Sequence, residues 1–246
     1  MNTQVLIGID DTDNLETHGT GRRARELGEL LAASALAEVD GITRHQLLID
    51  PRIPYTSHNS SACLTVRVTT DRLPELIATA RSFLLRESAP GSDAGLCVAN
   101  RSQVTAAHQE FGERAKREVL TIDQARDFAH RVDLMMEGLT GTGGGIIGAL
   151  AAVGLRAGGD DGRFLWLKGI RELSGVYTVE QLQQVIPIDA VQTIEGVGIP
   201  LTDRVELGLW LRPLLKAGRA VLLVEPGNES HLWRVVEKER VKQLSS

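Results

Sequence analysis

The residues best suited to chemistry lie near the N-terminus, in the run Asp10-Asp11-Thr12-Asp13, which directly follows an apolar segment. Carboxylates that converge at the end of a buried strand offer hard oxygen ligands to Mg²⁺, which binds few protein groups and completes its shell with phosphates and water. Such a run would also suit a solvated turn, because Asp and Thr favour turns through local hydrogen bonds. Asp10, Asp11 and Asp13 are therefore candidate metal ligands, and Asp11 is also a candidate catalytic residue.

A hydroxyl flanked by glycines follows the acidic run. Residues 18–21 read His-Gly-Thr-Gly and predict a flexible hinge. Thr20 is a candidate to accept or orient a phosphoryl group, and His18 is a candidate general base. The alternative for His18 is a histidine that is merely exposed on a loop.

Two arginines, Arg22 and Arg23, come next, in the first turn of a predicted helix. Cations at this end oppose the helix dipole, which favours negative charge by about 0.3–1 kcal/mol per group. Arginines at the start of a helix, despite this cost, are typical of an anion site built from backbone N–H groups and guanidinium groups. The alternative is that both arginines pair with the carboxylates of residues 10–16.

A second chemical candidate is the glycine-rich stretch 141–148, which precedes an apolar helix. Gly143, Gly144 and Gly145 would let backbone amides approach an anion closely. The stretch fits the dinucleotide-binding pattern formally, but the residues before it predict a helix where that fold needs a strand. Small residues that let the following helix pack tightly are an equally good explanation.

Strands and helices alternate along most of the chain, which indicates a mixed α/β (α+β) fold. Hydrophobic periodicity predicts strands at 4–10, 46–49, 62–68, 95–99, 164–167, 221–224 and 232–236, and helices at 22–39, 72–87, 105–119, 123–137 and 146–155. The last two strands predict a hairpin, and Thr121 with Gln124 and Thr178 with Gln181 are candidate capping boxes. We expect three parts: residues 1–58, 59–174 and 175–246.

Composition excludes several classes of protein. With 42% hydrophobic and 24% charged residues among 246, the chain can bury a core and is not globally disordered. No apolar run is long enough to span a bilayer, and no basic leader precedes an apolar segment, so we expect a cytoplasmic protein without a membrane partner. A net charge of −5 and only 4% aromatic residues count against an RNA-binding protein. Two cysteines exclude a disulfide scaffold and a multi-cysteine zinc site.

Four segments of the sequence together resemble the archaeal tRNA agmatidine synthetases. They are Ile-Gly-Ile-Asp-Asp-Thr-Asp-Asn at 7–14, Ile-Pro-Tyr at 53–55, Asp-Ala-Gly-Leu-Cys-Val at 93–98 and Gly-Gly-Gly-Ile-Ile-Gly-Ala-Leu-Ala-Ala-Val-Gly at 143–154. The resemblance implies a kinase-like part followed by a ferredoxin-like part, with ATP and Mg²⁺ bound at the aspartate run. In that family ATP phosphorylates a tRNA cytosine and agmatine displaces the phosphate. The threonine that becomes phosphorylated there corresponds to Thr20.

The sequence also departs from that family's pattern. The family's Cys-Thr-Thr is Gly19-Thr20-Gly21 here, and its basic Lys-Thr-Arg-Gly-Asn segment is replaced by residues 56–60. We expect the family's oligonucleotide-binding domain and zinc ribbon to be absent. The sequence therefore predicts an ATP- and Mg²⁺-dependent phosphotransferase or synthetase that acts on a tRNA or a small-molecule acceptor. The alternatives are a nucleotide-binding module without turnover and an RNA-binding protein.

Overall fold

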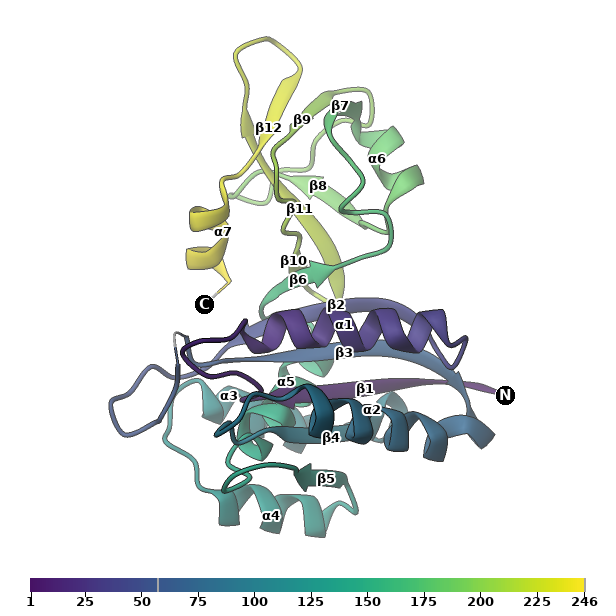
Figure 1. The fold of residues 1–246 in the computed structure, drawn as a ribbon. Coiled ribbons are helices and arrows are strands. Elements are labelled where there is room, and N and C mark those ends of the chain that lie inside the picture. Colours follow the sequence, from purple (N-terminus) through teal and green to yellow (C-terminus); the bar gives the residue numbers. More distant parts are fainter. Residues whose placement is uncertain (57, 246) are drawn as a thin grey trace.

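A mixed α/β fold, as predicted, is seen in the computed structural model, which describes residues 1–56 and 58–245 (Figure 1). The strands are β1 (Asn2–Asp10), β2 (Glu38–Gln46), β3 (Ser60–Thr69), β4 (Gly95–Asn100), β5 (Met135–Gly138), β6 (Arg163–Trp166), β7 (Gly175–Thr178), β8 (Ala190–Gln192), β9 (Arg204–Leu207), β10 (Leu214–Lys216), β11 (Arg219–Pro226) and β12 (Leu232–Val235). They lie in the order β5-β4-β1-β3-β2-β6-β10-β11-β12-β9-β7, with β8 beside β11.

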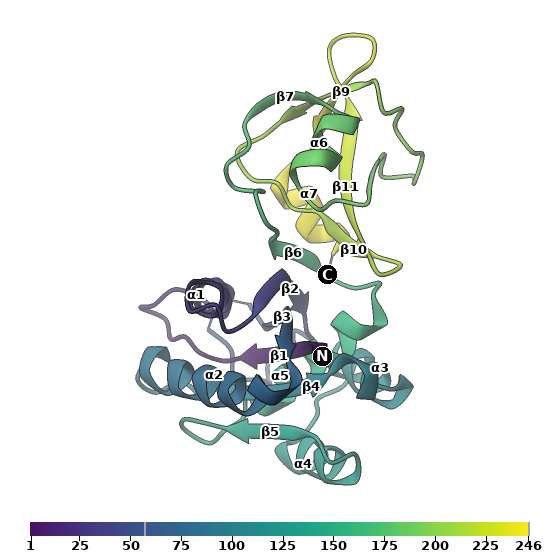
Figure 2. The same cartoon turned by 90° about the vertical axis from the view of Figure 1, so that its right-hand side faces the viewer.

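Most helices pack around the N-terminal strands, and the last two lie in the C-terminal part (Figure 2). The helices are α1 (Thr20–Ala33), α2 (Leu73–Glu87), α3 (Ala106–Ala115), α4 (Ile122–Arg131), α5 (Ile146–Gly158), α6 (Val179–Val185) and α7 (Lys238–Leu244). Helices α1 and α2 cover one face, and α3 and α5 cover the other. None of these helices, within the described residues, is long and apolar enough to cross a membrane.

Alternate side chains of β1 point to opposite faces of the sheet and pack against the two layers of helices. Val5, Ile7 and Ile9 are fully buried with α1 and α2, whereas Leu6 packs with α5. Gly8 faces α5 as well, and a Cβ atom there would clash with the Ala149 carbonyl. The helix therefore lies directly against the strand, with its N-terminus at the edge where β1 ends.

The predicted helix at 22–39 is too long, and the strand predicted at 46–49 is misplaced. The Ser34 hydroxyl donates to the Leu30 carbonyl, and Ala35 adopts a φ of +50°, which ends α1. The chain then enters β2, where Val39 and Ile42 complete the apolar cluster beneath α1. The spacing of these apolar residues fits either a helix or a strand. They form a strand because β2 pairs with β3.

The predicted helix at 123–137 is also too long. Helix α4 ends at Arg131, Asp133 adopts a φ of +50°, and residues 135–138 pair with β4 as β5. A strand therefore does precede the glycine-rich stretch, contrary to expectation. Because β5 is antiparallel to β4, the stretch still lacks the parallel βαβ unit of a dinucleotide-binding fold.

The C-terminal residues form a second apolar core, beyond β6 and β10. Strands β11 and β12 pair as the predicted hairpin, and both predicted capping boxes are present. Arg163 of β6 pairs with Leu214 of β10, which joins this core to the N-terminal strands. The boundaries at 58 and 174 stay predictions; β1 pairs with β3 across the first of them.

Candidate nucleotide site

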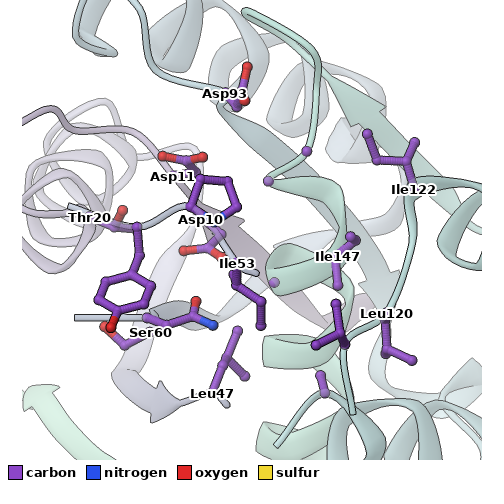
Figure 3. A pocket seen from close by; sticks show the side chains of 18 of the residues that line it. Asp10, Asp11, Thr20, Leu47, Ile53, Ser60, Asp93, Leu120, Ile122 and Ile147 are labelled. Atoms are coloured by element: carbon purple, nitrogen blue, oxygen red, sulfur yellow. The ribbon is translucent and has the colours of Figure 1, made fainter. Parts of the chain in front are cut away.

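A cavity of about 320 Å³ lies where β1 ends and α5 begins (Figure 3). We call it the Asp10 cavity. Asp10, Asp11, Asp13 and Thr20 line one side of it. The glycine-rich residues Gly144, Gly145 and Gly148 line it as well, although they are far away in the sequence. A volume of this order is typical of small-ligand sites.

The opposite wall of the Asp10 cavity is apolar. Figure 3 shows Leu120, Ile122 and Ile147 across from the aspartates, with Leu47 and Ile53 closing the floor. One wall is thus suited to a flat apolar group, and the other to cations and phosphates. This apolar wall was missed in the sequence, because it is assembled from four separate segments.

Thr20 is a buried hydroxyl of the cavity that takes part in several hydrogen bonds. Its side chain is 6% exposed, and its Oγ donates to Asp13 Oδ1 over 3.1 Å. The Thr12 backbone N–H donates to the same Oγ over 3.3 Å. Asp13 also accepts the Thr20 backbone N–H, at the start of α1, and the Thr56 hydroxyl. Asp13 therefore orients Thr20 and can accept its proton.

Asp10 and Asp11 have unusual electrostatics. Burial, and then the neighbouring Asp11, raise the pKa of Asp10 to about 8. Burial, and then Asp93, raise the pKa of Asp11 to about 6, and Asp11 adopts a φ of +51°. Arg44 attracts Asp10 only weakly by comparison. A cation bound here would offset the repulsion among these carboxylates.

The glycine-rich loop is held by a residue that the sequence analysis did not single out as part of the site. Asp93 accepts both the backbone N–H and the hydroxyl of Thr142, and its carbonyl accepts the Gly145 N–H. Asp93 stands just before the buried strand β4, at the same edge as Asp10, because Asp10 and Gly95 are register partners. An acidic residue beside a buried strand was the signal that could have found it.

Close packing explains two of the glycines, and an anion-binding role for the stretch stays a prediction. A Cβ atom on Gly148 would clash with the Asp10 carboxylate, and one on Gly145 would lie 2.9 Å from the Asp10 carbonyl oxygen. These two glycines therefore allow close packing. Gly144 lines the cavity, whereas Gly143 does not, and the Gly143 amide donates to the Thr140 carbonyl.

Three predicted residues lie away from the Asp10 cavity. Arg22 and Arg23 both pair with Glu26, over 2.7 and 2.6 Å, and neither lines the cavity. They do not pair with residues 10–16 either. His18 is exposed and is also absent from the lining. The structure therefore brings together the acidic run, Thr20 and part of the glycine loop, but not these three side chains.

Within the described residues, no three acidic, histidine or cysteine side chains converge closely enough to hold a metal ion by themselves. Asp13 is engaged with hydroxyls, which leaves Asp10 and Asp11 as the carboxylates open to a cation. Two carboxylates plus substrate phosphates are an ordinary Mg²⁺ environment, so the donor set fits the ion only together with a nucleotide.

Comparison with known proteins supports the resemblance seen in the motifs. No protein-family model matches the chain. An uncharacterized protein of Methanocaldococcus jannaschii is 29% identical over 155 residues, which cover 62% of this chain and 50% of that protein. The solved complex of TiaS with an isoleucine tRNA and ATP is 27% identical with a TM-score of 0.55, over 62% of this chain and 36% of the TiaS chain. This chain is similar to TiaS.

Two further solved structures agree with this similarity. The complex of TiaS with the same tRNA, AMPCPP and agmatine is 26% identical with a TM-score of 0.54, and it covers 62% of this chain and 36% of its own. A tRNA fluorescent labeling enzyme is 28% identical with a TM-score of 0.55, over 61% of this chain and 36% of that enzyme. The chain thus spans half the length of the curated relative and about a third of TiaS.

Proposed function

We propose that this protein is an ATP- and Mg²⁺-dependent enzyme that transfers a phosphoryl group at Thr20 in the course of modifying a tRNA. The observation that carries the proposal is the Thr20 hydroxyl, which is buried at the rim of the Asp10 cavity and donates to Asp13 over 3.1 Å. The similarity to TiaS, solved with ATP and an isoleucine tRNA, supports ATP as the donor and tRNA as the class of acceptor.

Thr20 and Asp13 can perform the first transfer. Thr20 Oγ attacks the γ-phosphorus, Asp13 accepts the hydroxyl proton, and the bond between the γ-phosphorus and its bridging oxygen breaks to release ADP. The Thr12 N–H already donates to Thr20 Oγ over 3.3 Å and keeps it in place for the attack. Such positioning supplies much of the rate in phosphoryl transfer.

The two walls of the cavity suit the two ends of ATP. The side chains of Leu120, Ile122 and Ile147 offer an apolar surface to the adenine ring. The opposite wall would hold the phosphates next to Gly144, where the absence of a side chain permits close approach. Mg²⁺, held by Asp10 and Asp11, would neutralise charge that develops on the phosphate oxygens.

Incubation of the protein with γ-³²P-labelled ATP and Mg²⁺ tests this proposal. We expect label on the wild-type chain and on Thr20→Ser, and none on Thr20→Ala, because only the first two keep a hydroxyl. Thr17→Ala is the matched control, since Thr17 lies in the same loop but its hydroxyl bonds Asn14 instead of lining the cavity. Label that persists on Thr20→Ala would contradict the assignment.

A thermal-shift measurement with ATP separates turnover from simple binding. ATP that stabilises the wild type without any labelling would indicate a nucleotide-binding module, the alternative without chemistry. ATP that neither stabilises nor labels the protein would exclude a nucleotide function for the Asp10 cavity.

A further inference from the structure

Five arginines lie close enough for their charges to interact, on α1, β2, β6 and the segments after β6 and before β10. Figure 1 shows α1, β2, β6 and β10 where the N-terminal strands meet the C-terminal part. The five arginines come from distant parts of the sequence, and we call them the arginine cluster: Arg25, Arg44, Arg163, Arg171 and Arg212. The cluster is notable because the chain as a whole has a net charge of −5.

The fold forces two members of the cluster into register. Arg44 of β2 and Arg163 of β6 are direct partners in the antiparallel pair. Like charges in directly opposite positions destabilise a sheet. Arg163 is only 4% exposed, so little water screens it from its neighbour. The pKa of Arg163 falls to about 10, first through burial and then through Arg44 and Arg212.

Two other members flank an exposed aromatic ring. The guanidinium carbons of Arg171 and Arg212 lie 5.2 and 5.3 Å from the centre of the Trp210 ring. Trp210 is 51% exposed, and the preceding Leu209 is 97% exposed. Burial, and then Arg171 and Arg25, lower the pKa of Arg212 to about 10. Cations and a half-exposed aromatic side chain therefore occupy the same surface.

The chain supplies little negative charge to the cluster. Among residues 1–56 and 58–245, no ion pair joins any of the five arginines to a carboxylate; Arg44 donates to Ser60, and Arg163 donates to Ser245. Asp10, Glu26, Glu29 and Glu239 attract members of the cluster only from beyond ion-pair range. An anionic ligand would offset this repulsion.

The cluster adjoins the Asp10 cavity. Arg44 donates to the Ser60 hydroxyl over 2.9 Å, and Ser60 lines the cavity. Arg212 contacts Trp210 and lies close enough to Arg44 for their charges to interact, so basic side chains extend from Trp210 toward the rim of the cavity. Arginines can bind the phosphates of a nucleic acid, and an exposed aromatic ring can contact its bases. Regularly spaced phosphates with accessible bases are found in single-stranded nucleic acid, so this surface suits such a ligand.

We propose that the accessible members of the arginine cluster, above all Arg171 and Arg212, hold the phosphate backbone of an RNA acceptor, with one base against the exposed part of Trp210, so that the strand reaches the Asp10 cavity. This inference rests on the proposed function for the identity of the acceptor. The motifs that resemble the agmatidine synthetases end at Gly154, and three members of the cluster lie beyond them. The C-terminal part of this chain would therefore take part in binding RNA.

Binding of a fluorescein-labelled oligouridine, measured by anisotropy over a range of KCl concentrations, tests the inference. For R171A/R212A we expect the slope of log K against log[KCl] to become shallower by about 0.7 for each phosphate that the two side chains no longer neutralise. For Trp210→Ala we expect affinity to fall about 10-fold with the slope unchanged, because stacking releases no counterions.

Matched controls come from the same part of the chain. Arg204 and Arg234 are exposed arginines that pair with Glu229 and Glu225, so R204A/R234A removes equal charge outside the cluster. Leu201→Ala removes an exposed apolar side chain in the same way. Equal loss of binding or slope in R171A/R212A and R204A/R234A would overturn the proposal, as would a wild type that binds no oligouridine.

The outcome is separable from that of the proposed function. Thr20 labelling that proceeds in R171A/R212A while RNA binding is lost supports both proposals. Thr20 labelling without any RNA binding by the wild type overturns only the arginine cluster. RNA binding that depends on the cluster, in a protein that labels no residue with ATP, overturns only the phosphotransferase. Unfractionated tRNA used as competitor distinguishes RNA from free phosphate compounds, for which inorganic triphosphate is the matching competitor.

Discussion

Two groups of like charge in this molecule contrast with one group in which the charges cancel. Asp10 and Asp11 repel each other in the Asp10 cavity, and the arginine cluster repels itself beside it. Asp161, by comparison, is buried between His45, over 2.8 Å, and the ammonium group of Lys116. His45 Nε2 in turn bonds the buried Thr43 hydroxyl.

The contrast indicates which charged groups stabilise the fold and which are available to bind a ligand. The group around Asp161 is buried and internally satisfied, so it needs no ligand and serves the fold. Its Thr-His-Asp order resembles a catalytic triad, yet Thr43 and His45 are 0% exposed and no substrate could reach them. The uncompensated groups lie at the Asp10 cavity and at the junction beside it. In the two proposals, Mg²⁺ would supply the opposite charge at the first and RNA phosphates at the second.

The largest effect on Thr20 labelling should come from Asp13, the carboxylate that accepts the Thr20 hydroxyl hydrogen bond. We expect Asp13→Asn to lower Thr20 labelling about 10²–10⁴-fold, because the amide cannot accept the hydroxyl proton. The variant keeps an oxygen for the N–H at the start of α1, so the fold should persist. The rate of ³²P incorporation measures the change, with Asp123→Asn on α4 as control. Labelling at the wild-type rate would remove Asp13 from the mechanism.

Removing the charge of Asp161, which pairs with His45 and Lys116, should lower stability instead. We expect Asp161→Asn to lower the free energy of unfolding by about 3 kcal/mol, since it leaves Lys116 without its carboxylate and weakens the bond to His45. Urea denaturation measures this value. Asp160→Asn is the neighbouring control, because the Asp160 side chain bonds only the Ala217 N–H within the described residues. Equal values for the two variants would contradict the structural role.

Asp10 should behave in the opposite way. We expect Asp10→Asn to raise the free energy of unfolding by about 1–3 kcal/mol in the absence of divalent cations, because it removes a carboxylate that burial and Asp11 destabilise. The same variant should lose the stabilisation that Mg²⁺ and ATP together give the wild type. Thermal unfolding with and without both ligands checks each part; a destabilised variant would show that the carboxylate serves the fold.

His45 makes one separable contribution to the pH dependence of stability, and the raised pKa values of Asp10 and Asp11 act in the opposite direction. Burial lowers the pKa of His45 below the ordinary value of 6.5, so the unfolded chain takes up the proton first as pH falls through that value. Stability is therefore lost on acidification, by up to about 1.4 kcal/mol per pH unit for this one group. The lowered pKa of Asp161 acts in the same direction below pH 3.8. Urea denaturation at several pH values should show a shallower slope for His45→Asn than for His130→Asn on α4.

Residues that are contiguous in the sequence were the predictable part of the site. The acidic run, Thr20 and the glycine stretch each follow or precede a buried element, and two of these elements meet because Gly8 lets α5 lie on β1. The predicted α/β fold, the hairpin and the capping boxes were found for the same reason: local pattern determines them. The ends of α1 and α4 were wrong, because residues with positive φ and strand pairing decide them.

The arginine cluster and the apolar wall could not be predicted, because they depend on register and packing between distant segments. Arg44 faces Arg163 only through the β2–β6 pairing, which follows a shift in register at Ile42. Net charge and aromatic content, averaged over the chain, counted against RNA and concealed this local concentration of charge. Composition therefore excludes a surface that is basic throughout, but not basic side chains gathered at one junction.

The smallest expected effect is on stability, and it comes from removing one charge from the arginine cluster. Arg171→Gln removes one exposed charge that repels Arg25 and Arg212 but makes no ion pair within the described residues. We expect the difference in free energy of unfolding from the wild type to be about 0.2–0.5 kcal/mol more favourable at low salt than at high salt, because salt screens the repulsion between arginines, whereas the loss of the contact with Trp210 is common to both conditions. Arg204→Gln, which breaks a pair with Glu229, should show the opposite dependence on salt. A cluster that is truly uncompensated must show this difference in sign, because only there does the loss of a positive charge relieve the fold.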